Sequence, residues 1–346
     1  MSQPPSRLLH GQRIYPVSAE RMAAVQDGAV DVIVTSPPYN RGKCYSGDDR
    51  RAHDDRLSES AYLALLRRVF AECRRVLRDD GLFFLNIGDA AGDQGKSERV
   101  AQTAVQAGFR RIQTVAWVKS LLGKGHYTPS GRDRRLNNCW EAVFLLAKTE
   151  RYRLDPKAIG IPYADKSNIG RYGETDLRDA GNVWLVTYSR TTGHTVKKGH
   201  DAPFPVELPY RCIKLVPGAR LVLDPFGGTM STLAAARALG LRGIGFEPFP
   251  RWSVIEACLA EGARFRPPPV QLIPELERGV AVLLELVREL GDGGTIEEVL
   301  ARRRMRRDDR ELVLRLAGAA APPPPEARRP RRRHTETTPA LPFEEH

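Results

Sequence analysis

The apolar positions near the start of the chain predict a strand, a helix and a second strand. Residues 30–35 (VDVIVT) form a short β-branched run that stops at a Ser-Pro-Pro turn, which is typical of a buried parallel strand. A helical pattern of apolar residues begins at Ser58, and we expect it to close at Asp80 and Gly81. Residues 82–87 (LFFLNI) then predict a second buried strand, so this segment has the order strand, helix, strand.

The same alternation continues, interrupted by one segment of different composition. Residues 150–200 are rich in Arg, Lys, Gly, Asp, Thr and Tyr, and we expect a loop-rich insert outside the core, with only a brief apolar stretch at 183–186. The other predicted elements are strands at 114–118, 142–147, 220–223 and 243–246, a helix at 205–216 and an alanine-rich helix that ends at Leu239.

The last part of the chain differs from the rest. Three prolines at 267–269 precede two predicted helices, one over 276–290 and one from a capping box at Thr295 to about residue 317. The Pro- and Arg-rich residues 319–346 carry too few apolar side chains for a packed core, so we expect them to be disordered.

The charge of the chain is strongly positive, since 54 Lys and Arg against 42 Asp and Glu give a formal net charge of +12. Residues 110–200 hold seventeen of the basic residues and eight of the acidic ones, and such an excess favours a polyanion or an anionic membrane surface as partner. We find no signal peptide and no run near the roughly 18 apolar residues of a membrane span. Five widely spaced cysteines indicate neither a disulfide framework nor a zinc site, so we expect a cytoplasmic protein.

A glycine turn after residues 220–223 is the first candidate site. Gly227 and Gly228 separate a predicted strand from a predicted helix, and Glu247 ends the next strand, 19 residues after Gly228. Such a turn lets backbone amides approach a nucleotide-like ligand, and the acid can bind ribose hydroxyls. A bare Asp-Pro-x-x-Gly turn is also common as a purely structural turn, so this signal alone is moderate.

The TSPPYN segment at 35–40 is the more specific candidate. Its two prolines fix the backbone and expose a carbonyl group, while Ser36 offers a hydroxyl group and Tyr39 an aromatic face. This combination suits a planar base that carries an amino group. Tyr39 would stack on the ring, and the Ser36 hydroxyl and the Pro37 carbonyl would accept hydrogen bonds from the two amine protons.

The two motifs together resemble the exocyclic-amine DNA methyltransferases. These have an [D/N/S]-P-P-[Y/F/W] motif and a D-P-F-x-G motif, and the catalytic motif comes first in their β class, as it does here. The resemblance covers about residues 12–262 and includes the segments RVLRDDGLFFLNIGD, VAWVKS, NNCWEAVFLLAK and APFPVELPYRCIKL. It implies a Rossmann-like α/β fold with circularly permuted motif order, in which helices cover both faces of a mostly parallel twisted sheet. It also implies methyl transfer from S-adenosylmethionine, without a metal, to the amino nitrogen of a DNA base that is flipped out of the duplex.

The resemblance also assigns site residues. It places catalysis at Ser36, Pro37, Pro38 and Tyr39. It places the methionine half of the cofactor at Asp224, Pro225, Phe226 and Gly228, its ribose at Glu247, its adenine near Trp252, and the closure of its pocket at Phe204 and Pro205. In two places the chain departs from the family pattern. Met230 stands where the last glycine of the cofactor motif is usual, and Val17-Ser18-Ala19 replaces an acidic segment, which leaves Ser18 as a weak candidate for an adenine contact.

The resemblance and the composition together divide the chain into five parts. These are the catalytic half at 1–120, an inserted target-recognition region at 121–200 with a core strand at 137–148, the cofactor-binding half at 201–266, a helical accessory region at 267–318 and a disordered basic tail at 319–346. We expect the inserted region to contact DNA phosphates and base edges through Arg132, Arg134, Arg135, Arg171, Lys197 and Lys198.

Several alternatives stay open at this point. Ser36 favours N4 of cytosine as the methylated atom, but Asn40 is typical of the adenine N6 enzymes, and serine also occurs among these. A catalytically inactive DNA-binding protein is the alternative from a different class. The expected partners are double-stranded DNA and a cognate restriction endonuclease of a restriction-modification or related defence system, with no membrane, and the chain would act as a monomer or a homodimer.

Overall fold

The computed structural model describes residues 5–40, 56–89, 92–119, 136, 138–163, 166–171, 173–186 and 204–267. The chain divides into two compact units, residues 1–271 and 272–346, and all the described residues belong to the first unit. The two helices and the disordered tail predicted for the C-terminal part therefore lie outside the described residues. In the described ranges no helix is both long and apolar enough to cross a membrane.

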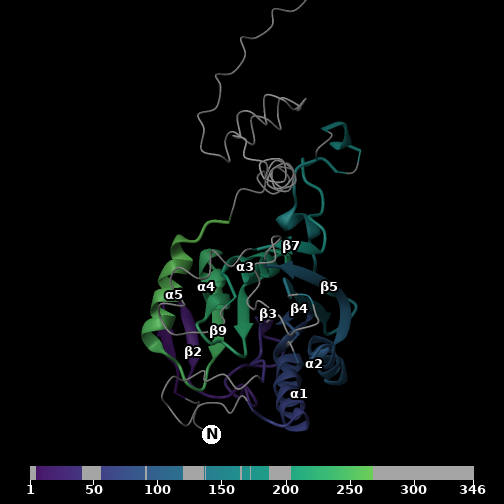
Figure 1. The fold of residues 1–346 in the computed structure, drawn as a ribbon. Helices are drawn as coiled ribbons and strands as arrows, with labels where there is room; N and C mark the ends of the chain where they lie inside the picture. Colours follow the sequence, from purple (N-terminus) through teal and green to yellow (C-terminus); the bar gives the residue numbers. More distant parts are fainter. Residues whose placement is uncertain are drawn as a thin grey trace, which may run out of the picture. The chain divides into compact units, whose positions relative to one another are not determined.

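A mixed β-sheet forms the centre of the first unit (Figure 1). Its strands among the described residues are β1 (Arg7–Leu9), β2 (Gln12–Tyr15), β3 (Val30–Thr35), β4 (Leu77–Ile87), β5 (Arg110–Val118), β6 (Trp140–Ala147), β7 (Val183–Leu185), β8 (Leu221–Asp224) and β9 (Arg242–Phe246). They are ordered β1-β2-β9-β8-β3-β4-β6-β5-β7. The five strands from β2 to β4 in this order run parallel, whereas β6 runs antiparallel to both β4 and β5. Consequently β3, β4, β5, β8 and β9 all end, and β6 begins, at one edge of the sheet, which we call the carboxyl edge.

Helices cover both faces of this sheet. They are α1 (Glu59–Val76), α2 (Lys96–Gln106), α3 (Glu207–Lys214), α4 (Ser231–Ala238) and α5 (Trp252–Arg264), with short 3-10 turns η1 (Pro156–Ile159) and η2 (Lys166–Asn168). In the fully buried strand β3, Ile33 packs in a cluster with α1 and α2, whereas Val32 and Val34 pack in another with α3 and α4. Successive strand residues point to opposite faces, so the run of apolar residues in β3 follows from burial on both sides.

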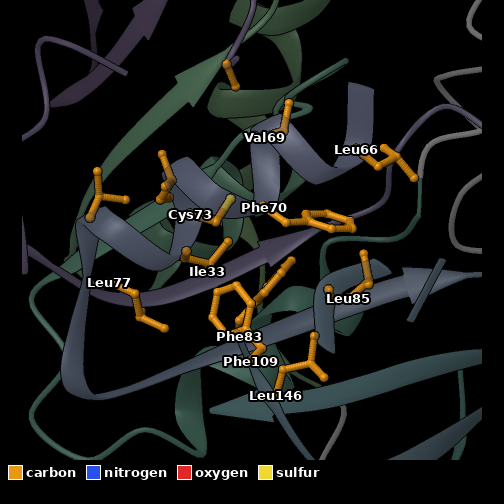
Figure 2. Close-up of a cluster of buried hydrophobic side chains, with 14 of the residues drawn as sticks. Ile33, Leu66, Val69, Phe70, Cys73, Leu77, Phe83, Leu85, Phe109 and Leu146 are labelled. Carbon is orange, nitrogen blue, oxygen red and sulfur yellow. The ribbon is translucent and has the colours of Figure 1, made fainter. Parts of the chain in front are cut away.

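The α1 face shows why this segment is helical. Ser58 caps the helix, since its hydroxyl oxygen accepts a hydrogen bond from the Ala61 amide. Phe70 points from α1 onto the sheet, where its ring packs edge-on against Phe83 with the centroids 5.7 Å apart (Figure 2). Phe109 packs on the other side of Phe83, at 5.2 Å. The helical spacing of apolar residues after Ser58 thus corresponds to one continuous buried stripe.

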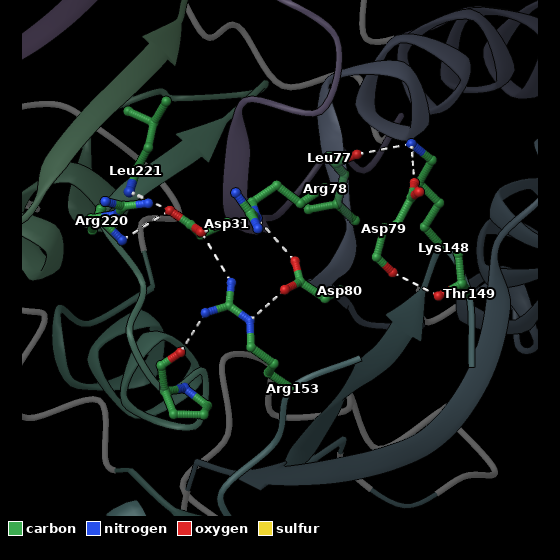
Figure 3. Close-up of polar contacts among 11 residues, drawn as sticks. Asp31, Leu77, Arg78, Asp79, Asp80, Lys148, Thr149, Arg153, Arg220 and Leu221 are labelled. Atoms are coloured by element: carbon green, nitrogen blue, oxygen red, sulfur yellow. Dashed lines mark hydrogen bonds and ion pairs between the residues drawn. The ribbon is translucent and has the colours of Figure 1, made fainter. Parts of the chain in front are cut away.

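The end of α1 differs from the prediction. The helix ends at Val76 and β4 begins at Leu77, so the expected stop at Asp80 and Gly81 is wrong and both residues lie inside the strand. Within this strand Asp80 forms ion pairs with Arg78 at 2.9 Å and with Arg153 at 3.0 Å (Figure 3). A side chain at position 81 would collide with the Asp31 carbonyl, since a Cβ there would come within 2.7 Å of it. Glycine at position 81 therefore lets β4 approach β3. The local sequence suggests that Gly81 ends a helix, but in the folded chain it lies inside a strand.

Residues 183–186 also differ from the expectation of a loop outside the core. Val183–Leu185 forms β7, which pairs in parallel with β5, and Trp184 and Val186 are buried. The Trp117 indole nitrogen donates a hydrogen bond of 2.8 Å to the Val186 carbonyl. The apolar pattern also missed β1, β2, α2 and α5. The strands and helices predicted within the described ranges are present, and most of them have shifted ends.

Candidate active site

The two sequence motifs meet because their strands are neighbours. Strands β3 and β8 pair in parallel, with Ile33 beside Leu223, so the turn after Thr35 and the turn after Asp224 leave the carboxyl edge side by side. The Thr35 hydroxyl donates a hydrogen bond of 2.5 Å to the Asp224 carboxylate, and both side chains are buried. This bond joins the predicted catalytic turn to the predicted cofactor turn.

Asp224 is enclosed within this junction. Its Oδ1 atom also accepts a hydrogen bond from the Phe226 amide at 3.1 Å. Burial raises the pKa of Asp224 to about 6, although hydrogen bonds from Thr35 and Thr232 partly offset this. The contacts show that Asp224 links the two turns, while direct contact of Asp224, Pro225 or Phe226 with a cofactor stays a prediction.

Glu247 closes the glycine turn from the neighbouring strand. It follows β9, and one carboxylate oxygen accepts from the Gly228 amide at 2.9 Å while the other accepts from the Phe249 amide at 3.1 Å. Burial raises the pKa of Glu247, and the two amide hydrogen bonds oppose this shift. An ionised carboxylate has about four lone-pair positions, so two fixed amides orient the group and leave acceptor positions for a diol.

Met230 shows how the chain accommodates a side chain where a glycine is usual. Its backbone lies in the left-handed region, with φ of 67°, and it directly precedes α4. The fully buried side chain lies against Gly227 and Gly245, where an added Cβ would come within 2.4 and 2.5 Å of it. The strain of that backbone costs about 1–2 kcal/mol. Burial of the methionine side chain offsets this cost.

The Ser-Pro-Pro-Tyr turn is anchored from several elements. The Pro38 carbonyl accepts a hydrogen bond of 2.8 Å from the Tyr62 hydroxyl on α1, and the Tyr39 carbonyl accepts one of 3.1 Å from Lys96 on α2. Asn40 has a φ of 51° and binds both the amide and the carbonyl of Leu57 through its side chain. Within the part of the chain that the structure describes, no group donates to the Pro37 carbonyl, which is the acceptor expected for the amine.

A polar cluster that the sequence did not reveal lies beside this turn. The Tyr39 hydroxyl donates to a Glu141 carboxylate oxygen at 2.9 Å, and Lys119 forms an ion pair with the other oxygen. Burial raises the pKa of Glu141, but the charge of Lys119 and hydrogen bonds from Lys119, Tyr39 and Asn86 outweigh burial and hold this pKa below its usual value. Glu141 is therefore ionised at neutral pH. Lys119 lies in the segment VAWVKS and Glu141 in the segment NNCWEAVFLLAK. In the sequence alone, each looks like an ordinary polar residue at the end of a strand.

The other predicted site residues are placed as follows. Trp252 packs against the buried cluster of Ile14 and Met230, and the Arg7 guanidinium lies over its ring at 4.9 Å. Phe204 and Pro205 precede α3, and Phe204 packs on the cluster of that face. Ser18 is exposed and bonds to Glu20, and Arg171 is exposed after η2. The five remaining basic residues lie outside the described ranges, namely Arg132, Arg134, Arg135, Lys197 and Lys198.

Comparison with known proteins decides the family. The family model of the N6/N4 DNA methylases matches residues 30–250, which include both turns and all the strands from β3 to β9. The chain belongs to this DNA methylase family.

Relatives of this chain include named type II methyltransferases. M.SfiI of Streptomyces fimbriatus is 29% identical over 44% of this chain and 40% of its own length. M.MwoI of Methanothermobacter wolfeii is 28% identical over 58% of this chain and 32% of its own length. M.Cfr9I of Citrobacter freundii is 27% identical over 65% of this chain and 79% of its own length. The chain thus spans less than half of the length of the first two relatives.

The fold agrees with the family. The PvuII DNA methyltransferase (cytosine-N4-specific) aligns with 72% of this chain and 86% of its own chain, with a TM-score of 0.53 and 20% identity. The predicted α/β methyltransferase fold, with helices on both faces of a largely parallel sheet, is confirmed.

Proposed function

We propose that this DNA methylase transfers a methyl group from S-adenosylmethionine to the exocyclic amino nitrogen of a base in double-stranded DNA. The observation that carries the proposal is the hydrogen bond between Thr35 and Asp224, together with the parallel pairing of β3 and β8. These contacts hold a turn suited to an amine-bearing base beside a turn suited to a nucleoside cofactor. Catalysis then consists of orientation and electrostatic stabilisation, with no covalent intermediate.

The glycine turn fits the cofactor. Gly228 carries no side chain that would exclude a ligand from the turn, and Glu247 is fixed so that it can bind the ribose hydroxyls. Phe204, Pro205 and Trp252 complete the proposed pocket, with Ser18 as the candidate for the adenine contact. When bound, S-adenosylmethionine supplies an electrophilic methyl group on a sulfonium centre.

The Ser-Pro-Pro-Tyr turn holds the base. The target base is flipped out of the duplex at a cost of a few kcal/mol, which stacking on Tyr39 partly offsets. The Ser36 hydroxyl and the Pro37 carbonyl accept the two N–H groups of the amine. These hydrogen bonds localise the lone pair of an otherwise conjugated nitrogen and direct it toward the methyl group.

Which base is methylated is inferred from the sequence alone. Ser36 favours N4 of cytosine and Asn40 favours N6 of adenine, and we propose cytosine as the target with adenine as the alternative. The basic residues of the region at 121–200 are proposed to recognise the DNA sequence, in the cytoplasm and alongside a cognate endonuclease of a restriction-modification system. The proposal includes the division of the chain into the five parts given above, and action as a monomer or homodimer.

Methyl transfer to DNA tests the proposal directly. The full chain is incubated with S-adenosylmethionine that carries a labelled methyl group and with unmethylated duplex DNA, and the DNA is then digested to nucleosides. We expect the label in N4-methylcytosine, and label in N6-methyladenine would support the alternative base. DNA binding without any labelled nucleoside would favour an inactive DNA-binding protein and overturn the proposal.

Replacement of Glu247 tests the cofactor site separately. We expect Glu247→Gln to weaken S-adenosylmethionine binding, measured by calorimetry, by about 10-fold or more, because hydrogen bonds to a charged acceptor contribute about 1.5–3 kcal/mol. Glu261→Gln, at an exposed position on α5, is the matched control and should bind the cofactor like the wild type. Equal affinity of the two variants would remove Glu247 from the ribose-binding role.

A further inference from the structure

The cluster of Lys119, Glu141 and Tyr39 forms a directed chain of hydrogen bonds that ends at Ser36. We propose that Glu141 is a positioning residue that sets the direction of this chain, so that Ser36 presents its lone pairs to the amine of the target base. This inference rests on the proposed function and deepens it. It adds a residue on β6 to a site that the sequence motifs confine to the turns after β3 and β8.

The direction follows from counting hydrogens. An ionised carboxylate can only accept, so the Tyr39 hydroxyl must donate its single hydrogen to Glu141, at 2.9 Å. The Tyr39 oxygen then offers only lone pairs on its other side, where Ser36 donates to it at 3.4 Å. The Ser36 hydroxyl hydrogen is thereby engaged, and its oxygen can only accept from a further partner.

This direction matters for the chemistry of an amine. Without the carboxylate, Tyr39 could donate to Ser36, and the Ser36 hydrogen could point at the amine nitrogen. Such a hydrogen bond would engage the lone pair that attacks the methyl group. With the carboxylate in place, Ser36 instead accepts an N–H of the amine and leaves the nitrogen lone pair available.

Neighbouring residues fix the position of the Glu141 carboxylate. Lys119 pairs with one oxygen and is itself buried, with its amino group 4.8 Å from the Trp117 ring centroid. Asn86, in β4, donates to the other oxygen at 3.4 Å and to the Ala142 carbonyl at 3.1 Å. A side chain at Gly88 would collide with Glu141, since a Cβ there would lie 2.5 Å from its Cγ. Three residues from β4 and the ends of β4 and β5 thus hold this carboxylate where the Tyr39 hydroxyl donates to it.

A double-mutant cycle separates this role from a merely structural one. Single-turnover rates of methyl transfer are measured for the wild type, Glu141→Gln, Tyr39→Phe and the double variant. We expect Glu141→Gln to lower the rate about 10-fold and to have almost no further effect when Tyr39 is phenylalanine, because the glutamate acts through the phenol hydrogen. Glu98→Gln, at an exposed carboxylate on α2, should keep the wild-type rate. DNA affinity of all these variants should stay within about 2-fold of the wild type.

Two further measurements make the outcome decisive. In a Ser36→Ala background there is no hydroxyl to direct, so Glu141→Gln should have almost no further effect on the rate. Urea unfolding of the same variants without cofactor or DNA should show that the effects of Glu141→Gln and Tyr39→Phe on stability are not additive. An equal loss of rate from Glu141→Gln in the wild-type, Tyr39→Phe and Ser36→Ala backgrounds, or additive effects on stability, would overturn the inference. A wild-type chain that transfers no methyl group would overturn the proposed function instead, while the stability cycle would still report on the hydrogen-bond chain.

Discussion

Replacing Ser36 by alanine is expected to lower the single-turnover rate of methyl transfer by about 10²–10³-fold. The variant loses one of the two acceptors for the amine, and the loss of one fixed polar group that stabilises a transition state typically has an effect of this size. Affinity for DNA should change little, because this hydrogen bond matters most as the nitrogen becomes tetrahedral. Quenched-flow transfer of a labelled methyl group, measured beside DNA binding, gives both quantities.

Variants of Tyr39 and of a distant serine complete this test. Tyr39→Ala should lose most of the activity because it removes a stacking face worth about 1–3 kcal/mol per base, whereas Tyr39→Phe should retain part of it. Ser60→Ala, at an exposed position of α1, should behave as the wild type. If Ser36→Ala and Tyr39→Ala both transfer methyl groups at the wild-type rate, the active site does not lie at this turn.

Replacing Asp31 by alanine should lower the free energy of unfolding by about 3–5 kcal/mol. The carboxylate is buried at the start of β3, where one oxygen pairs with Arg153 at 3.1 Å and the other accepts from the amides of Arg220 and Leu221 (Figure 3). Removing it leaves the two backbone N–H groups without their acceptor and takes one of its partners from the partly buried Arg153 guanidinium, which keeps Asp80. The loss is large because these groups cannot regain full hydration in the folded state.

A second aspartate provides the control for Asp31. Asp27 pairs with Arg75 at 2.5 Å but its side chain is 78% exposed, so Asp27→Ala should cost less than about 1 kcal/mol. Asp31→Asn should lie between the two because it keeps one acceptor oxygen but loses the charge. Urea denaturation of the three variants gives the free energies. Equal losses for Asp31→Ala and Asp27→Ala would show that the contacts of the Asp31 carboxylate contribute no more to the free energy of unfolding than a surface ion pair.

The sequence by itself predicted the two turns and most of the strands that carry them. The TSPPYN and DPFGG segments each combine a buried strand with proline or glycine, and these signals are local, so they can be recognised without knowing any partner. The continuous apolar run at 30–35 also indicated a buried parallel strand. Comparison with the family motif showed that Met230 replaces a usual glycine, whereas its left-handed backbone was found only in the structure.

Only the tertiary structure showed where long-range contacts outweigh local sequence preferences, and which residues lie beside the two turns. Asp80 and Gly81 lie in a strand, where Asp80 pairs with Arg153, more than seventy residues later, and Gly81 lies close to the Asp31 carbonyl. Glu141 reaches the catalytic turn because β6 runs antiparallel to β4 and so begins at the edge where β3 ends. The role of the Lys119 and Glu141 side chains can be recognised only from their contacts with each other and with Tyr39, which are distant in sequence. Strand pairing joins residues that are distant in sequence, so a local pattern does not show which strand lies beside which. The motifs therefore identified the two turns, whereas the strand order of the sheet determined which residues surround them.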